Sequence, residues 1–307
     1  MSSSAITNSF LNNINLIQQR MASVQNELTS GYRVTTASDA PDEISDLLDT
    51  RANLLQATQA QSNLSLAQGT VNTAESSLET GETLIEQALS LGQEGASSTS
   101  AGTSSRTTIV TQLQQLQAQL VDISNTTVQG QYVFGGDDSA NPPYAMNWNV
   151  SANGVTALQS AASTSLVTDA RGNSFSISQN AQTIFDHQDP VTGLSDASSV
   201  FAGIQGLATA LAGGVQTDID TAMTNLRTAQ GYYSQQLASY GTYQDRVSSA
   251  LTDASSYQTQ LRTQLSSLQD ADIATAATQL TQYQTQEQAA MAAEGEMSQK
   301  SLFDYLG

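Results

Sequence analysis

Apolar residues recur along the C-terminal part of the chain in alternating steps of four and three. Between Ile219 and Leu268 this stride meets an apolar side chain at every position except Gln230, Gln244 and Gln258. A period of about 3.5 residues, held over about fifty residues, predicts one long helix whose seam faces partner helices throughout. The three glutamines share one heptad position, where buried polar residues are expected to set register rather than add stability.

The N-terminal segment repeats this spacing in a more polar sequence. Residues 4–30 predict a helix that ends near Gly31. Its seam consists of Phe10, Ile14, Ile17, Met21, Val24 and Leu28. Each buried anchor contributes roughly 1.5–3 kcal/mol, whereas ordering each backbone residue costs roughly 1–2 kcal/mol. We therefore expect this helix to become ordered only when a partner covers it.

The segment after this helix predicts two further helices. Ser38-Asp39-Ala40-Pro41 carries the capping signal of the first. Its seam alternates large and small residues: Leu64, Ala67, Val71, Ala74, Leu78, Gly81, Ile85 and Ala88. A loop is expected from Gly92 to Ser105, which is rich in Gly, Ala, Ser and Thr. The next seam is Ile109, Leu113, Leu116, Leu120 and Ile123, so the two helices form a hairpin that residues 219–268 complete into a bundle.

The pattern of residue types changes after Gly130 and predicts β structure. Residues 131–136 alternate and are rich in β formers, and short runs at 164–168 and 174–178 flank a turn at Arg171-Gly172-Asn173. We interpret residues 138–183 as a small β-rich insert. Residues 194–214 return to helix-forming types.

The C-terminal segment 270–307 predicts a last, alanine-rich helix. Its apolar row is Ile273, Ala277, Leu280, Tyr283, Ala290, Met291 and Met297. The chain ends with four bulky residues, Leu302, Phe303, Tyr305 and Leu306, which form an association site if no part of the chain covers them. The predicted assembly interface therefore joins the N-terminal seam to Ile273, Leu280, Tyr283, Met291, Leu302, Phe303, Tyr305 and Leu306.

These patterns predict a mainly α fold. The N- and C-terminal segments build a long coiled coil and helical bundle, which carries a small β-rich insert. The expected parts are an N-terminal coiled-coil helix (1–36) paired with a C-terminal one (266–307), a bundle in two pieces (37–137 and 184–265), and the insert (138–183).

Charge and composition exclude several classes of protein. The 307 residues include 28 acidic and nine basic ones, for a net charge of −19, so nucleic acid is an unsuitable partner. The chain has no cysteine, and no apolar run is long enough to predict membrane insertion. Residues 1–28 lack the pattern of a cleaved secretory signal.

The sequence contains few residues of the types that usually carry out catalysis. There is one histidine, His187, and no spacing typical of a metal site. Asp186-His187-Gln188-Asp189 precedes Pro190, and we interpret it as an exposed loop rather than an acid–base site. We predict no enzyme activity, no cofactor and no metal.

Stretches near both ends resemble a known family. They are Glu27-Leu28-Thr29-Ser30-Gly31-Tyr32-Arg33-Val34 with Ser38-Asp39, and Asp270-Ala271-Asp272-Ile273-Ala274-Thr275. They resemble the flagellin and flagellar hook-associated family. Three further stretches are similar to members at the hook–filament junction: Gly130-Gln131-Tyr132-Val133-Phe134-Gly135-Gly136, Asn180-Ala181-Gln182 followed by Ile184-Phe185, and Ser301-Leu302-Phe303-Asp304-Tyr305-Leu306. The first eight residues are closer to flagellin itself.

The resemblance implies a fold and a setting. The terminal helices would form the inner coiled-coil wall of a tube, with a helical bundle outside it and an exposed β insert. The chain would be exported through the flagellar type III apparatus, escorted by a chaperone on its C-terminal region. It would then assemble as a homo-oligomeric ring in the extracellular flagellum, between a neighbouring hook-associated protein and flagellin.

Two alternatives stay open from the sequence. The chain could be a flagellin that forms the filament itself. It could instead be a cell-surface module whose β insert binds a glycan or another ligand around Trp148 and Tyr144.

Overall fold

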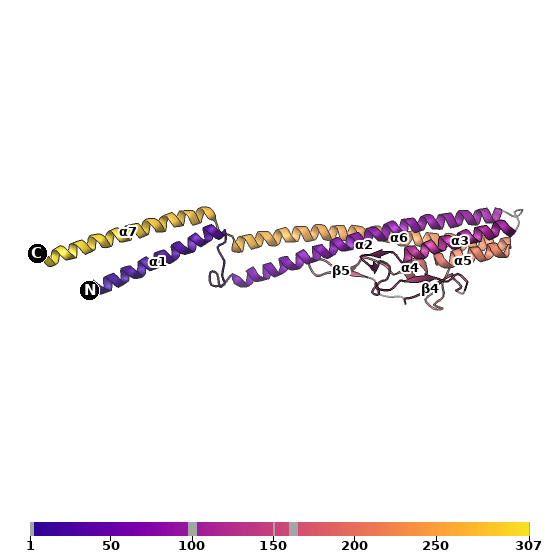
Figure 1. Ribbon diagram of the computed structural model, residues 1–307, viewed down its shortest axis with the longest axis horizontal. Coiled ribbons are helices and arrows are strands. Elements are labelled where there is room, and N and C mark those ends of the chain that lie inside the picture. The colour runs from indigo at the N-terminus through magenta and orange to yellow at the C-terminus, as the bar shows by residue number, and fades with distance from the viewer. Residues whose placement is uncertain (1–2, 98–102, 150, 160–164, 307) are drawn as a thin grey trace. The chain divides into compact units, whose positions relative to one another are not determined.

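The structure is a computed structural model that describes the chain except residues 1–2, 98–102, 150, 160–164 and 307 (Figure 1). The side chains of residues 3–7, 103 and 296–306 are also outside the description. The helices are α1 (Ser3–Ser30), α2 (Ile44–Ser97), α3 (Thr103–Ser124), α4 (Ala181–Phe185), α5 (Val200–Gly213), α6 (Gln216–Gln269) and α7 (Ile273–Leu306). The strands are β1 (Thr127–Val128), β2 (Gln131–Tyr132), β3 (Tyr144–Met146), β4 (Val155–Ala157), β5 (Leu166–Thr168) and β6 (Ser174–Ser176). The predicted mainly α fold with a small β-rich insert is confirmed.

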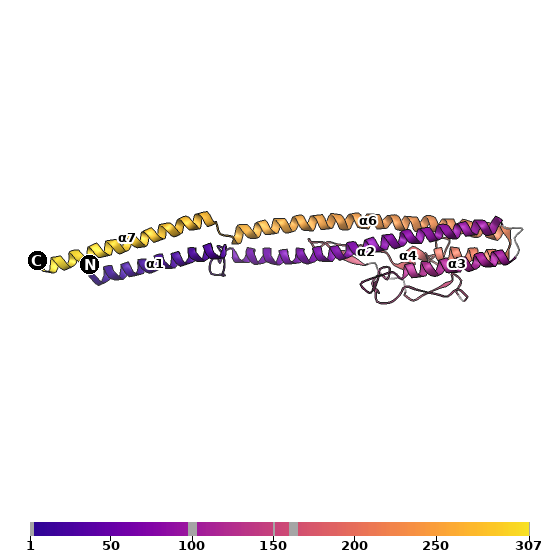
Figure 2. The same cartoon turned by 45° about the horizontal axis from the view of Figure 1, so that its top comes forward.

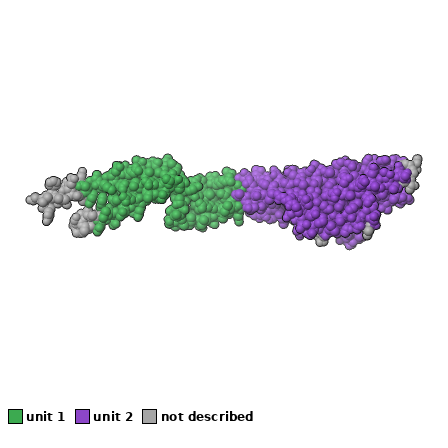
Figure 3. Space-filling view, viewed as in Figure 1, with its two compact units in different colours: residues 1–56, 258–307 green, residues 57–257 purple. Residues whose placement is uncertain are grey.

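The chain divides into two compact units, coloured separately in Figure 3. One consists of residues 1–56 with 258–307, and the other of residues 57–257. The sequence placed the borders of the terminal pair at residues 36 and 266. The borders of the two units lie inside α2 and α6, each of which is a single helix in the structure, and the predicted borders at 36 and 266 stay a prediction. The division of the remaining residues into bundle and insert stays a prediction.

The long seam predicted on α6 is buried. Residues at one heptad position have no exposed surface from the start of the helix to Ala254: Ile219, Leu226, Tyr233, Tyr240, Val247 and Ala254. The glutamines fall at the other seam position, where Gln230 and Gln244 are half-buried and Gln258 is buried. Gln244 Nε2 donates to Asn72 Oδ1 of α2 at 3.1 Å, a polar contact that favours one register of the two helices.

The seam predicted on α2 is also buried at every position from Leu64 to Ala88. Gly81 shows why small residues alternate with large ones. A Cβ added at Gly81 would lie 2.1 Å from Tyr233 Oη, and this hydroxyl donates to the carbonyl oxygen of Leu78 at 3.1 Å. The missing side chain therefore lets a buried tyrosine of α6 reach the backbone of α2.

The predicted bounds of the loop, Gly92 to Ser105, are too wide, because α2 continues to Ser97 and α3 begins at Thr103. The glycines that suggested a loop lie inside the helix. A Cβ at Gly92 would meet Met223 Sδ at 2.3 Å, and one at Gly95 would meet Leu211 Cδ2 at 2.5 Å. These glycines serve close packing of α2 on α5 and α6 rather than chain reversal.

The β structure consists of three separate antiparallel pairs rather than one sheet. The pairs are β1–β2, β3–β4 and β5–β6, and the last places Val167 opposite Phe175 across the predicted turn. Of the expected strand 131–136 only β2 forms, because Phe134 turns inward, where it is fully buried against Phe185 and Tyr240. The expected helix 194–214 begins later, at Val200, where Ser199 Oγ accepts from the Ala202 backbone N–H at 3.1 Å.

The connections between α1 and α2 and between α6 and α7 meet at one place, which we call the joint (residues 31–43 with 268–272). Arg33 N–H donates to Gln269 O at 2.7 Å, and Ala271 N–H donates to Gly31 O at 2.9 Å. The Arg33 guanidinium also donates to Leu268 O at 2.8 Å and pairs with Glu43. Two stretches that are far apart in sequence are therefore held together by backbone hydrogen bonds.

Local turns and a small apolar cluster shape the joint. Gly31 has a φ of +75°, and its N–H donates to Glu27 O, which ends α1. Val34, Ala40 and Leu47 form a buried cluster against Leu265 and Leu268. Asp272 accepts from the backbone N–H groups of Ala274 and Thr275 at the start of α7.

Substitution of Gly81 tests the close approach of α2 and α6. Gly81→Leu should lower the free energy of unfolding by about 2 kcal/mol or more, because an added side chain overpacks the Tyr233 contact. Gly69→Ala is the matched control, since it lies in the same helix with open space around it and should raise the stability by about 0.5–1 kcal/mol. Chemical denaturation of both variants measures the two effects. Equal stability of Gly81→Leu and the unsubstituted chain would contradict the proposed packing.

The joint should weaken in acid through Asp39. Its carboxylate accepts the backbone N–H groups of Thr36 at 2.7 Å and Thr35 at 2.9 Å, and these bonds lower the pKa of Asp39 to about 2. Because the folded pKa lies below the unfolded value of about 3.9, the stabilisation is complete above that value and is lost as the pH falls toward 2. Carboxyl titration by NMR should therefore give a midpoint near 2 for Asp39.

Two variants control this titration. Asp39→Asn should remove the pH dependence of the turn, whereas Asp49→Asn, at an exposed position of α2, should leave it unchanged. An Asp39 midpoint at the ordinary value for aspartate would show that the turn is not held by this carboxylate.

Candidate assembly interface

The terminal helices α1 and α7 pack against each other in opposite directions, as Figures 1 and 2 show. Gln18 Nε2 of α1 donates to Glu287 Oε1 of α7 at 2.9 Å. Where the pair meets the joint, Tyr32 forms an antiparallel bridge with Asp270. These two contacts define the register of the pair along its length.

The predicted seam of α1 faces its partner. Ile14 and Val24 are buried, and Phe10, Ile17, Met21 and Leu28 are half-buried. The neighbouring asparagines and glutamines on the rest of the helix are exposed. The sequence therefore identified which face of α1 is covered within the chain.

Only part of the predicted row of α7 is covered within the chain, and its role as an interface between copies stays a prediction. Leu280 and Tyr283 are half-buried, but Ile273, Ala277 and Met291 are exposed. The covered face starts at Ala276 and continues at Leu280, Tyr283, Glu287, Ala290 and Glu294. Leu280, Tyr283 and Ala290 of the predicted row lie on this face, and Ala276 and the aliphatic parts of the two glutamates complete it opposite the larger side chains of α1. Ala276, which lies at the right spacing from Leu280, was the signal that the prediction missed.

Apolar side chains are therefore left on the outside of the pair. The exposed fractions are 51% for Leu11, 47% for Leu16, 49% for Ile273 and 55% for Met291. The backbone of α7 includes the four bulky residues near its end, but their side chains are outside the description: Leu302, Phe303, Tyr305 and Leu306. The terminal pair thus covers one seam within the chain and still presents apolar groups that the chain does not cover.

Ionisable groups elsewhere are engaged in structural contacts. His187 Nδ1 lies 2.7 Å from Asp196 Oδ2, and its ring packs at 4.8 Å from that of Tyr232. Asp186 is buried and accepts from the hydroxyls of Ser195 and Ser199 at 2.6 and 2.7 Å. The prediction of an exposed loop is therefore wrong for Asp186, which is buried and hydrogen-bonded to two serine hydroxyls. Among the described residues no group of three or more potential metal ligands gathers.

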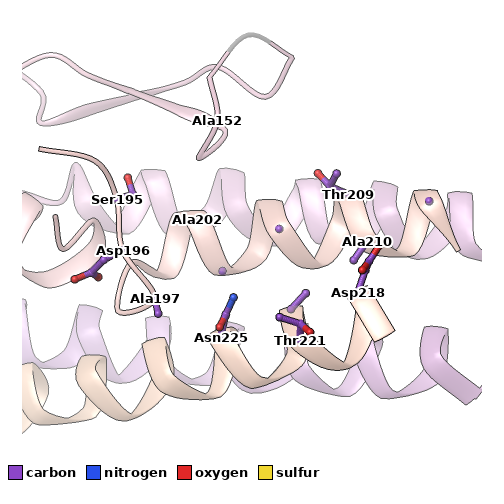
Figure 4. A pocket seen from close by; sticks show the side chains of 14 residues that line it. Ala152, Ser195, Asp196, Ala197, Ala202, Thr209, Ala210, Asp218, Thr221 and Asn225 are labelled. Atoms are coloured by element: carbon purple, nitrogen blue, oxygen red, sulfur yellow. The ribbon is translucent and has the colours of Figure 1, made fainter. Parts of the chain in front are cut away.

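Figure 4 shows a groove of about 810 Å³ between α5, the start of α6 and the loop before α5. Thr221 and Asn225 point from α6 toward α5. Small residues of α5, including Ala202, Gly206 and Ala210, line the opposite side. The groove has no aromatic surface, and one of its carboxylates, that of Asp196, is paired with His187.

The residues considered for a ligand site in the insert are used for packing. Tyr144 is 3% exposed, and its ring meets that of Phe201 at 5.2 Å. Trp148 is half-buried against the core. Burial raises the pKa of Tyr144, with Asp186 nearby as a smaller cause. The tyrosine is therefore a neutral core residue rather than a surface for stacking a ligand.

Solved structures share this fold at low sequence identity. A putative flagellar hook-associated protein from Vibrio parahaemolyticus is 17% identical with a TM-score of 0.62, over 76% of this chain and 100% of that one. FlgL from Xanthomonas campestris is 15% identical with a TM-score of 0.56, over 70% of this chain and 98% of that one. A sequence search among curated proteins found no match. Within the described residues, no helix is both long and apolar enough to cross a lipid bilayer.

Two family models match the ends of the chain. The N-terminal helical region of bacterial flagellin matches residues 1–139, and the C-terminal helical region matches residues 216–306. Both stretches that meet at the joint lie inside these regions, while β3 to α5 lie between them. The matches confirm the resemblance drawn from the terminal motifs. With the two helical regions present in order and together spanning well over half of its length, the chain belongs to the bacterial flagellin family.

Proposed function

We propose that this chain is a non-enzymatic structural subunit of the bacterial flagellum, and that its copies form a ring joining the hook to the filament. Membership of the flagellin family gives the flagellar setting. The fold shared with a protein described as hook-associated supports the junction role. The observation that carries the proposal is the apolar surface left on both terminal helices by their own pairing.

This surface is suited to association because it lies on weakly stabilised helices. The α1–α7 seam is narrow: among the described side chains of α1 two apolar ones, Ile14 and Val24, are buried, and the covered residues of α7 are mostly small or polar. Covering Leu11, Leu16, Ile273 and Met291 in a neighbouring copy would bury further apolar area at about 25 cal/mol per Å². Assembly thus supplies stabilisation that the single chain lacks, and we infer that the terminal helices become fully ordered in the assembled state.

The remaining parts of the proposal concern location and partners. We infer that the chain is exported through the flagellar type III apparatus with a chaperone on its C-terminal region. In the extracellular flagellum its neighbours would be another hook-associated protein and flagellin. Support for a role without catalysis comes from His187 and Asp186, whose polar atoms are engaged in structural hydrogen bonds.

A filament-forming flagellin is the second candidate, because the matching family models are those of flagellin. Electron microscopy of the purified chain separates the two. A junction subunit should give no long filaments under conditions in which a flagellin polymerises. Long filaments of the pure chain would favour the second candidate.

Removal of residues 300–307 tests the role of the C-terminal end. The truncated chain should keep the thermal unfolding transition of residues 57–257, because none of that unit's core is removed. It should fail to join the flagellum, which complementation of motility and electron microscopy of the hook tip would measure. Gln282→Ala, at an exposed position of α7, is a control that should assemble normally. Normal assembly by the truncated chain would count against the proposal.

The double substitution Ile273→Gln and Met291→Gln tests the outer surface of the pair. Both side chains are about half exposed, so the stability of the isolated chain should change by less than about 0.5 kcal/mol. Self-association should nevertheless weaken, as sedimentation velocity would measure. Val24→Asp is the contrasting variant, because it places a charge in the seam and should separate α1 from α7 with loss of helicity. Undiminished association of the glutamine variant would exclude this surface as the interface.

A further inference from the structure

One dipeptide in the turn between β3 and β4 (residues 147–154) has a reactivity that the rest of the chain lacks. Asn153 is followed by Gly154, and no other asparagine of the sequence precedes a glycine. Asparagine is a thermolabile residue. It reacts most readily before glycine, because a following residue without a side chain lets its backbone nitrogen approach the amide carbon unhindered. The dipeptide is therefore a candidate for covalent modification.

The reaction is deamidation, and water is its only co-reactant. The Gly154 nitrogen forms a bond to Cγ of Asn153, and ammonia leaves from Cγ with the proton of that nitrogen, which gives a succinimide ring. Water then opens the ring at one of its two carbonyl carbons. The product is aspartate, or isoaspartate, in which the main chain continues through the side-chain carbon. In either product a carboxylate, which only accepts hydrogen bonds, replaces a neutral donor.

The fold requires glycine at position 154. Gly154 has a φ of +75°, and a Cβ on it would lie 2.4 Å from Gln117 Nε2 of α3 and 3.0 Å from Gln205 Oε1 of α5. Any other residue would be strained and would crowd these two amide groups. The close packing of the turn on α3 and α5 thus depends on the same glycine that makes Asn153 reactive.

In the folded chain the Asn153 amide is held at both ends. Ser151 Oγ donates to its Oδ1 at 2.5 Å, and its Nδ2 donates to Asp186 Oδ2 and to Ser195 Oγ, each at 3.1 Å. The attacking nitrogen is engaged as well, because the Gly154 N–H donates to Ser151 O at 3.2 Å. Ring closure needs both groups to leave these partners, so it requires local opening of the turn.

The same contacts couple the turn to α5. The carboxylate of Asp186 also accepts from Ser199 Oγ, which caps the start of α5. Asp186 is buried, and among the described residues it makes no ion pair. A carboxylate at position 153 would face it where a donor stood before. Two like charges in a buried site repel, and neither has a cation to compensate it.

We propose that Asn153 is a deamidation site that folding protects, and that its product releases the β3–β4 turn from α5. A chain reacts while the turn is unfolded or locally open, and the modified chain cannot restore the contact with Asp186. The modification therefore records the time that a chain has spent unfolded. This inference goes beyond the proposed function and does not depend on it.

Deamidation rates test the protection. The full chain is incubated in mildly alkaline buffer with and without denaturing urea, and peptide mass spectrometry with isoaspartate detection follows position 153. We expect the folded chain to react roughly tenfold more slowly or less, because only the open turn reacts. Ser151→Ala should react faster than the unsubstituted chain when folded and at the same rate in urea.

Two outcomes would overturn this part of the inference. Equal rates in the folded and unfolded chain would show that the turn does not protect Asn153. An unmodified position 153 after long incubation in urea would show that it is not a deamidation site. A synthetic peptide with the sequence of residues 151–156, incubated in both buffers, corrects for the effect of urea on the reaction itself.

Asn153→Asp reproduces one product and tests the release of the turn. Trp148, the single tryptophan of the chain, lies half-buried in this turn, and its carbonyl oxygen accepts from Gln205 Nε2 at 3.3 Å. We expect its fluorescence to shift to longer wavelength and to become several-fold more accessible to acrylamide in the variant. Asn149→Asp, at an exposed position of the same turn, is the matched control for the added charge and should keep Trp148 shielded.

Exchange of the two groups separates this contact from a general loss of stability. The double variant Asn153→Asp/Asp186→Asn again has one carboxylate and one donor, in reversed places, and should return the Trp148 fluorescence toward that of the unsubstituted chain. Thermal unfolding shows which variants are folded, and the exchanged pair gives the test even where Asn153→Asp alone unfolds. If Asn153→Asp leaves Trp148 as shielded as Asn149→Asp does, or if the exchange restores nothing, Asp186 does not couple the turn to α5.

Discussion

Burial of a single apolar column on α6 is the interaction on which the rest of the structure depends. Its members recur every seven residues and have no exposed surface from Ile219 to Ala254. Two of them are tyrosines whose burial raises the pKa of each hydroxyl, so both stay neutral. Tyr233 donates to the α2 backbone at Leu78, and Tyr240 accepts the Gln179 backbone N–H at 3.2 Å. The column therefore supplies the core and also fixes the positions of α2 and of the segment before α4.

The same helix ends at the joint, which is held mainly by backbone hydrogen bonds rather than by a long apolar seam. Backbone hydrogen bonds from Arg33 and Ala271 hold the two connections together, and a cluster around Val34 and Leu47 covers Leu265 and Leu268. Two of the stretches that resemble the family, residues 27–34 and 270–275, meet here. In this part of the chain turns, helix caps and an antiparallel bridge each depend on particular backbone geometry. The terminal helices begin and end at this point.

The low burial of the terminal helices and the high negative charge of the chain both affect how copies associate. The bundle core is rich in fully buried side chains, whereas the α1–α7 pair buries little and leaves apolar residues outside. A net charge of −19 opposes association of identical copies. Association then requires local contacts that outweigh this repulsion, and the exposed apolar residues of the terminal pair are suited to such contacts.

Periodicity by itself determined the seams of α1, α2, α3 and α6, because a helix that buries one stripe must repeat its apolar residues at that spacing. It determined the covered face of α7 only in part: Leu280, Tyr283 and Ala290 lie on it, but Ala276 and Glu287 were not predicted, since a bulky partner helix can be matched by small or polar residues. Nor could periodicity distinguish glycines that form a loop from glycines that allow close packing. Composition predicts a turn at Gly92 and Gly95, but in the structure both lie in α2, where the side chains of Met223 and Leu211 pack against them. The cavity between Arg171 and Arg246 was equally invisible. Its residues come from a turn and a helix about seventy-five positions apart, and only the packing of one on the other brings these two arginines to one cavity with Asp169 and Asp253.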